Sequence, residues 1–187
     1  MAFQIDRFTA SIGRMDGLQS PSKFHVRAYL PSSLDSTVLE FSCEAANVPG
    51  ITIASSAVKP HGYGSQYEVP LVPIYEDVQL SCMIDNSGRV TELFSKWQKS
   101  VVNHDYAPGE MGSSARPFNV SYRDSYAGIV EITAFDQAGF ENRTITLHQA
   151  WPKVVGSVQK SWREKDSYSV LPVTLTYRSH TTTDIRS

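Results

Sequence analysis

Short segments in which apolar and polar residues alternate recur along this chain, and they constrain its fold more than any other feature. A period of two places successive side chains on opposite faces of a β-strand, so each segment has one face to bury. In the clearest case, Val78, Leu80, Cys82 and Ile84 share a face. Segments of this kind occur at residues 23–30, 37–45, 76–84, 126–136, 141–149 and 169–178. They predict a mainly antiparallel β domain.

One segment departs from the alternation. Within residues 87–103, an apolar stripe recurs at helical spacing and contains Leu93, Phe94 and Trp97. Glu92 and Lys96 form an i,i+4 pair whose order suits the helix dipole. We therefore expect one α-helix packed on the sheets, with Leu93, Phe94 and Trp97 in the core.

Residues 51–72 form an extended hairpin in this prediction. Two apolar arms flank a turn whose glycines supply positive φ. The arms are only weakly amphipathic, so they have little to bury inside their own subunit. They are candidates for pairing with another chain, although a surface loop fits the residues equally well. The turn consists of Lys59, Pro60, His61, Gly62, Tyr63 and Gly64.

Length and charge limit the possible functions. A chain of 187 residues suits one domain, and its net charge of −2 offers no basic excess for holding nucleic acid. No apolar run is long enough for a membrane span, and the N-terminus lacks the apolar core of a secretory signal. Cys43 and Cys82 both lie in apolar rows, so we expect buried free thiols rather than a disulfide.

Motifs that carry chemistry are missing from the sequence. It contains no nucleotide-binding loop, nucleophile elbow or zinc-binding motif. His104 and Asp105 could begin a metal site, but no further ligand lies at a suitable spacing. We therefore expect no enzyme activity, no metal and no cofactor.

The remaining boundaries follow from composition. We expect a single domain over 1–187, with an N-terminal extension at 1–22, a long loop at 104–118 and a frayed tail at 179–187. The complete fold prediction is an antiparallel β-sandwich or partial barrel with one packed helix and a long protruding hairpin.

Several stretches, taken in order, resemble the tail tube proteins of contractile-tailed bacteriophages, whose fold is shared with type VI secretion tube proteins. They are a strand with a Pro-Gly turn, a strand leading directly into the helix, a hairpin strand, and a Trp-Pro crossover with a final strand. Their residues are 39–53, 70–101, 126–139, 145–162 and 170–178. Together they cover roughly residues 37–178, and their order and spacing carry the resemblance.

This resemblance implies a structural subunit of the virion tail, assembled in the host cytoplasm. Hexameric rings would stack into a hollow conduit for DNA and the tape-measure protein, with four strands per subunit in an inner barrel. The hairpin would reach the next subunit or ring. The implied partners are further copies of the chain, the tail sheath, the baseplate and the tail terminator. Trp151 would fill the core at a corner, and Pro152 would end the ladder there.

A conduit that passes DNA without binding it should have a neutral or acidic lumen. Polar rows without Lys or Arg on three predicted strands fit this requirement. The candidate lumen residues are Glu40, Ser42, Glu44, Gln79, Ser81, Glu131 and Thr133.

Two alternatives keep the fold but change the role, namely a baseplate-proximal tube initiator and the tube of a contractile injection or type VI secretion system. A third is a soluble β-sandwich binding module that uses the loop aromatics Tyr63, Tyr67 and Tyr106. A catalytic β-sandwich fits the residues least well.

Overall fold

The computed structural model describes most of the chain. The described residues are 5, 9, 10, 13, 19–31, 34–59, 62, 64–103, 119–163 and 167–184. The predicted loop at 104–118, most of the N-terminal extension, and Pro60, His61 and Tyr63 of the hairpin turn lie outside them.

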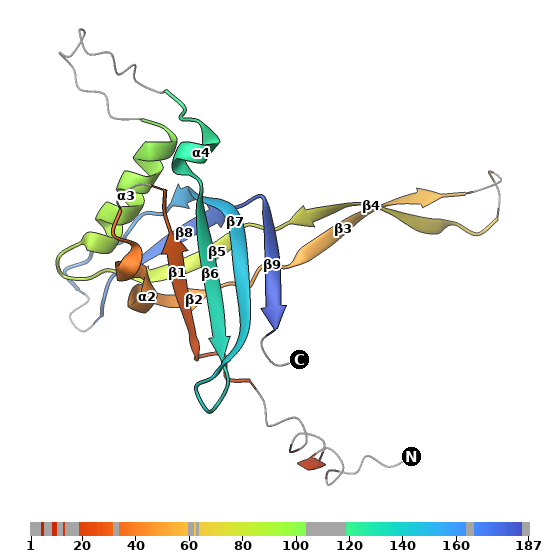
Figure 1. Ribbon diagram of the computed structural model, residues 1–187, viewed down its shortest axis with the longest axis horizontal. Coiled ribbons are helices and arrows are strands. Elements are labelled where there is room, and N and C mark those ends of the chain that lie inside the picture. The colour runs from red at the N-terminus through yellow and green to blue at the C-terminus, as the bar shows by residue number, and fades with distance from the viewer. Residues whose placement is uncertain are drawn as a thin grey trace.

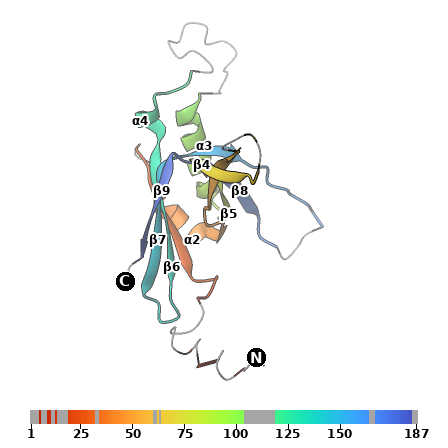
Figure 2. The same cartoon turned by 90° about the vertical axis from the view of Figure 1, so that its right-hand side faces the viewer.

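Antiparallel strands form two layers with the core between them, as Figures 1 and 2 show. The mainly β prediction is therefore confirmed, and the layers do not close into a barrel. One layer, called here the β6 layer, has the order β1–β6–β7–β9. Its strands are β1 (Phe24–Tyr29), β6 (Gly128–Phe135), the first part of β7 (Glu141–Val155) and β9 (Ser179–Asp184).

The second layer, called the β5 layer, has the order β7–β8–β5–β2. Its strands are the end of β7, β8 (Val170–Thr176), β5 (Val78–Met83) and β2 (Cys43–Ala46). Alternation directs Val78, Leu80 and Cys82 into the core, where each is at most 2% exposed. Gln79 and Ser81 point to the opposite face.

Strand β7 belongs to both layers, and its bend makes the corner of the sandwich. Gln149, at φ 54°, is the one described non-glycine residue with positive φ, and the ladder to β6 shifts register beside it. The expectation that Pro152 ends the ladder is wrong, because Pro152 pairs with Leu175 and β7 continues to Val155. The sharp turn is made three residues earlier, at Gln149, so the strand crosses layers without breaking.

Helix α3 (Arg89–Val101) covers one end of the sandwich (Figure 1). Leu93, Phe94 and Trp97 are buried in the core cluster with exposures of 5% or less. The Trp97 indole N–H donates to the backbone carbonyl of Tyr126 at 2.8 Å. Tyr126 ends the short helix α4 (Arg123–Tyr126). No described helix has the length and apolar character needed to cross a lipid bilayer.

Two sequence predictions about single elements are wrong. Residues 37–45 are not one strand, since a 3₁₀ turn η1 (Ser36–Val38) and the helix α2 (Leu39–Ser42) occupy most of them and only the last three residues belong to β2. The helical turn buries Leu39 and leaves Phe41 84% exposed, whereas a strand would place both on one face. Residues 179–184 are not a frayed tail, because they pair with β7 as β9.

Candidate assembly surfaces

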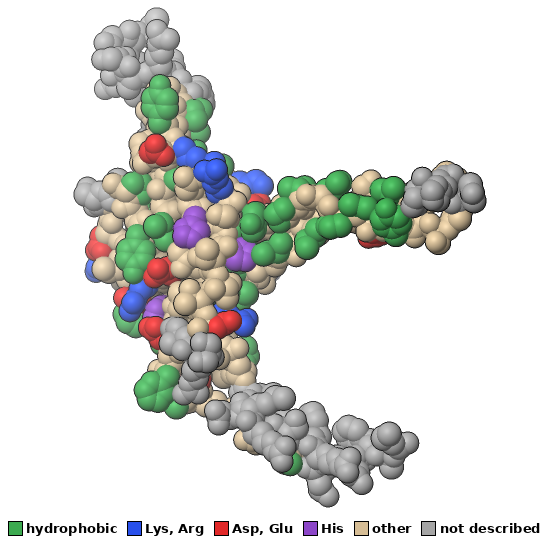
Figure 3. Space-filling view, turned by 45° about the vertical axis from the view of Figure 1, so that its right-hand side comes forward, with side chains coloured by type: hydrophobic (Ala, Val, Ile, Leu, Met, Phe, Trp, Pro, Cys, Tyr) green, Lys and Arg blue, Asp and Glu red, His purple; other side chains and the backbone are tan. Residues whose placement is uncertain are grey.

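The long hairpin is the most unusual surface of the molecule. Strands β3 (Ile51–Val58) and β4 (Tyr67–Tyr75) pair only with each other and extend far beyond the body (Figure 1). The protruding hairpin predicted from the sequence is therefore confirmed. Figure 3 shows apolar side chains along its length. At least half of the surface of each of the following is exposed: Ile51, Ile53, Tyr67, Leu71, Val72 and Ile74.

Both faces of the hairpin are apolar. Ile51 pairs with Tyr75 on one face, and Ala54 pairs with Val72 on the other. Its polar interactions are few: Thr52 donates to Glu76 at 3.2 Å, and Ser55 donates to Glu68 at 2.8 Å. An isolated two-stranded hairpin is marginally stable in water, and exposed apolar patches of this kind mark interaction sites. The hairpin therefore has the chemistry of a surface that another protein covers.

The strands of the hairpin continue the β5 layer. Strand β2 ends at Ala46 and leads into β3 at Ile51, while β4 ends at Tyr75 and leads into β5 at Val78. An ion pair lies at this junction, where Lys153 Nζ is 2.7 Å from Asp77 Oδ2. That bond from Lys153 lowers the pKa of the Asp77 carboxyl. The base of the hairpin also meets the β6 layer, where the ring of Tyr75 lies edge-on to His180 of β9 at 5.5 Å.

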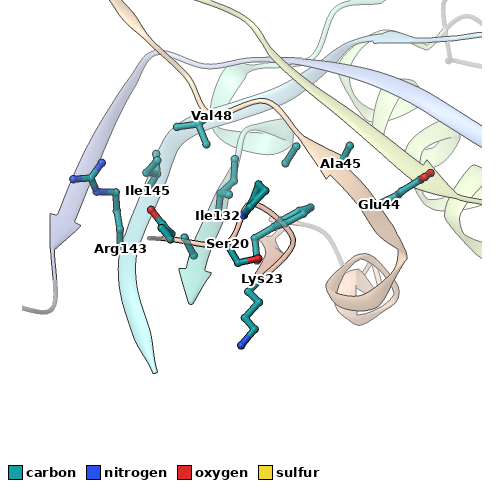
Figure 4. Close-up of a pocket in the computed structure, with 13 residues that line it drawn as sticks. Ser20, Lys23, Glu44, Ala45, Val48, Ile132, Arg143 and Ile145 are labelled. Carbon is teal, nitrogen blue, oxygen red and sulfur yellow. The ribbon is translucent and has the colours of Figure 1, made fainter. Parts of the chain in front are cut away.

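Figure 4 shows a second apolar surface, a pocket of about 450 Å³ between the two layers. It lies at the end of β6 opposite Gly128, where an added Cβ would be 3.5 Å from the Trp97 ring of α3. Ile132 and Ile145, both nearly buried, line it together with Val48. Its charged lining residues already have partners: Lys23 donates to Gln137 O, Arg143 pairs with Asp184, and Glu44 accepts from Tyr168. The pocket is therefore an apolar recess suited to packing.

The structure separates the candidate lumen residues instead of bringing them together. Glu44, Gln79 and Ser81 lie on the β5 layer and point away from the core or to its edge. Glu131 lies on the outer face of the β6 layer, opposite Arg27 of β1 and Thr146 of β7. Because the two outer faces point in opposite directions, one lumen cannot include both groups.

Three of these candidates need individual correction. Thr133 is 4% exposed, since it lies between His25 and Thr144 and its hydroxyl is 3.2 Å from that of Thr144. Glu40 and Ser42 lie on α2 rather than on a strand. Glu40 pairs with Arg27 at 2.7 Å, which raises the pKa of that guanidinium, and Ser42 donates to the Val38 carbonyl.

The outer faces of the two layers differ in charge. In the strands of the β5 layer the one described cation is Lys153, which is paired with Asp77. The outer face of the β6 layer carries Arg27, which is paired with Glu40, together with Glu131, His25 and His148. Arg143 and His180 lie on the other side of this layer, since Arg143 lines the pocket and His180 is opposite the buried Leu147. Each outer face therefore carries one Lys or Arg among the described strand residues, both of them ion-paired, and the β6 face carries two histidines in addition.

A metal site and an aromatic binding surface are the other sites that the sequence suggests. Among the described residues, no three His, Cys, Asp or Glu side chains are grouped so that they could hold a metal ion, and His104 and Asp105 fall outside that part of the chain. Of the three aromatics considered for a binding module, Tyr67 is 53% exposed at the start of β4. Tyr63 and Tyr106 lie outside the described residues.

The feature that sequence reasoning missed is the pocket, whereas the arms of the hairpin were recognised as a candidate contact without their individual residues being named. The sequence prediction concentrated on the turn at 59–64, whereas the exposed apolar area lies on both strands, for example at Leu71. The weak amphipathicity of residues 51–72 was the available signal for the arms. No signal in the sequence indicated the pocket, because residues from four separate segments line it.

Solved structures with the same fold come from an anti-feeding prophage and from an extracellular contractile injection system. One is in the "Cryo-EM structure of the anti-feeding prophage (AFP) baseplate, 6-fold symmetrised", with a TM-score of 0.66 and 11% identity over 91% of this chain and 98% of that one. Another is in a PVC sheath-tube complex of an extracellular contractile injection system, with a TM-score of 0.63 and 14% identity over 98% and 100%. A third, from the AFP tube terminating cap, has a TM-score of 0.61 and 12% identity over 98% and 95%. Identities this low show the fold alone.

Sequence comparison gives the family. No curated protein matches the chain. A family model described as "Phage tail tube protein" matches residues 14–183, which include every named strand except the last residue of β9. The resemblance noted in the sequence is thereby confirmed, and the chain belongs to the phage tail tube protein family.

Proposed function

We propose that this protein is a structural, non-catalytic subunit of a contractile tail tube. Six copies form a ring, and stacked rings enclose a conduit for DNA and the tape-measure protein. The observation that carries the proposal is the protruding hairpin, whose exposed apolar strands lack a partner within the described subunit. Family membership and the six-fold symmetrised baseplate among the similar structures support it.

Copies of the chain are the first partners in this proposal. The hairpin of one subunit packs against the edge of the β5 layer of the next, at strand β2, so that the outer face of that layer stays free. Sheath, baseplate and terminator proteins are further partners, because the similar structures come from a sheath-tube complex, a baseplate and a tube cap. The site of action is the virion tail, after assembly in the host cytoplasm.

Native mass spectrometry of the purified full-length chain tests this proposal. The expected species contain six chains or multiples of six, together with monomer at low concentration. A closed dimer that persists at all concentrations would contradict the proposal. In such a dimer each hairpin is covered by the other subunit, so no surface remains for adding further subunits to a ring or a tube.

A tube for injected protein cargo is the second candidate. It is favoured by the similarity to the tube of an extracellular contractile injection system. Both candidates share the subunit and the ring, and they differ in what the lumen passes. Particles purified with DNA inside the tube support the phage tail, and particles with protein cargo alone support the injection device.

The outer face of the β5 layer is the lumen face in this proposal. Its exposed strand residues include Gln79, and Lys153, the one cation among its described strand residues, is paired with Asp77. A face of this kind leaves DNA free to move, because there are few cations to replace the counterions on its phosphates. The opposite choice would place Arg27 in the channel beside Glu131.

A double substitution of Gln79→Lys and Ser81→Lys tests the lumen assignment. In a six-membered ring it adds about twelve positive charges, so assembled tubes should retain DNA at low salt and release it as salt rises. The matched control is Thr146→Lys with Thr181→Lys, which are cross-strand neighbours on the outer face of the β6 layer. Co-sedimentation with DNA is the measurement. If only the control tubes retain DNA, the lumen is the β6 face.

A further inference from the structure

Cys43 and Cys82 are the only cysteines of the chain, and both are free thiols. The fold brings them together from two strands of the β5 layer. Cys43 begins β2, the edge strand, and Cys82 lies near the end of β5. They are directly opposite each other in the antiparallel ladder.

Their side chains lie on the same side of the layer. Cys82 is fully buried in the core cluster, and Cys43 is half-buried and packs against that cluster. Each thiol shifts the pKa of the other, downward at Cys43 and upward at Cys82. Cys43 also contacts the Ala45 carbonyl at 3.4 Å, at the point where the ladder shifts register.

The spacing of opposite residues in such a ladder suits a covalent bond. Their Cα atoms lie about 4.5–5.5 Å apart, within the range of about 4.4–6.8 Å that disulfides use. A cysteine pair that starts this close needs little backbone movement to join. In addition, the irregular register beside Cys43 leaves the edge strand some freedom to adjust.

We infer that Cys43 and Cys82 form a latent disulfide site, which a small-molecule disulfide such as oxidised glutathione converts into a bond between β2 and β5. The site lies within a single subunit and needs no assembly. The bond would fasten the edge strand that leads into the hairpin to the centre of its layer.

The chemistry takes two thiol–disulfide exchanges. The Cys43 thiolate attacks one sulfur of the oxidised glutathione, forming a mixed disulfide and releasing one glutathione thiolate, which takes up a proton. The Cys82 thiol then loses its proton and attacks the Cys43 sulfur, which releases the second glutathione as a thiol. Two protein thiols are oxidised and one glutathione disulfide is reduced to two thiols.

The order of attack follows from the environment of each thiol. The interaction with the Cys82 thiol lowers the pKa of Cys43, and Cys43 is the more accessible of the two. The same interaction and burial raise the pKa of Cys82. Cys43 is therefore the attacking thiol and Cys82 the resolving one.

The experiment uses the reduced full-length protein with an excess of oxidised glutathione. We expect the thiol count in denaturant to fall from two to zero and the intact mass to fall by two hydrogens. Peptide mapping should join Cys43 to Cys82, and the melting temperature should rise by about 5–10 °C, reversibly with dithiothreitol. Cys82→Ala, the matched control, should keep a glutathione adduct on Cys43, whereas Cys43→Ala should react at least about tenfold more slowly.

Several results would overturn the inference. They are two thiols that persist in the wild type, a lasting glutathione adduct on wild-type Cys43, and a disulfide between chains instead of within one. A bond that forms but lowers the melting temperature would also do so, since the folded geometry would then resist it. If Cys82→Ala does not fold, the intact mass and the peptide map of the wild-type protein are sufficient to show whether Cys43 and Cys82 are joined.

Discussion

Replacing Ile53, Leu71 and Ile74 together with threonine will leave the subunit folded and will raise the concentration needed for assembly by about 100-fold. These side chains are 61%, 66% and 50% exposed on the hairpin. Full burial of such a side chain contributes about 1.5–3 kcal/mol, so covering the exposed part contributes roughly 1 kcal/mol each. Three substitutions thus remove about 3 kcal/mol from each contact, and tenfold in affinity corresponds to about 1.4 kcal/mol.

Light scattering as a function of protein concentration measures this effect, and circular dichroism checks the fold. Val120→Thr is the matched control, because Val120 is 66% exposed and lies outside the hairpin. Deletion of residues 59–64 should likewise give a folded chain that does not polymerise. Normal assembly of the triple variant would show that the apolar strands are not a contact between subunits.

The three tryptophans of the chain should respond to alanine substitution in the order of their burial. Trp97 is 1% exposed, stacks with Phe94 and donates a hydrogen bond to Tyr126. Trp97→Ala should cost about 3–5 kcal/mol of folding stability through lost burial and a cavity. For a domain of this size, this lowers the melting temperature by roughly 6–20 °C.

Trp151 and Trp162 provide the internal comparison. Trp151 is half-buried and meets the Tyr126 ring edge-on at 6.0 Å, so Trp151→Ala should cause a smaller fall. Trp162 is fully exposed, and Trp162→Ala should leave the melting temperature unchanged. Differential scanning calorimetry of the three variants in one buffer measures the series. Equal losses for Trp97→Ala and Trp162→Ala would contradict the described packing.

The sequence was sufficient to predict the elements that have clear periodicity. Alternating residues located β1, β5, β6 and β8, and the stripe containing Leu93 and Trp97 located α3. Such patterns are informative because each reports one buried face, and burial is a local consequence of the sequence. Hydrophobic periodicity also indicated the hairpin, because residues 51–72 are apolar but show no single face to bury.

Other features depend on contacts between distant segments. The alternation at residues 37–45 is too short to distinguish a strand from a helical turn. The burial of Leu39 in the core favours the helical turn α2. Strand β9 has no apolar row, and it forms because β7 offers a free edge for backbone pairing. The predicted lumen residues came from both layers of the sandwich. Alternation shows which side chains of a strand share a face, but it does not show which layer the strand joins.

The proposed function depends most directly on whether the chain assembles through its hairpin. Negative-stain electron microscopy of the purified full-length protein, beside the Ile53, Leu71 and Ile74 triple variant, tests this. We expect six-fold rings and hollow tubes from the wild type, and only small particles from the triple variant. Wild-type protein that stays a small monomer at every concentration, or triple-variant protein that forms the same tubes, would contradict it.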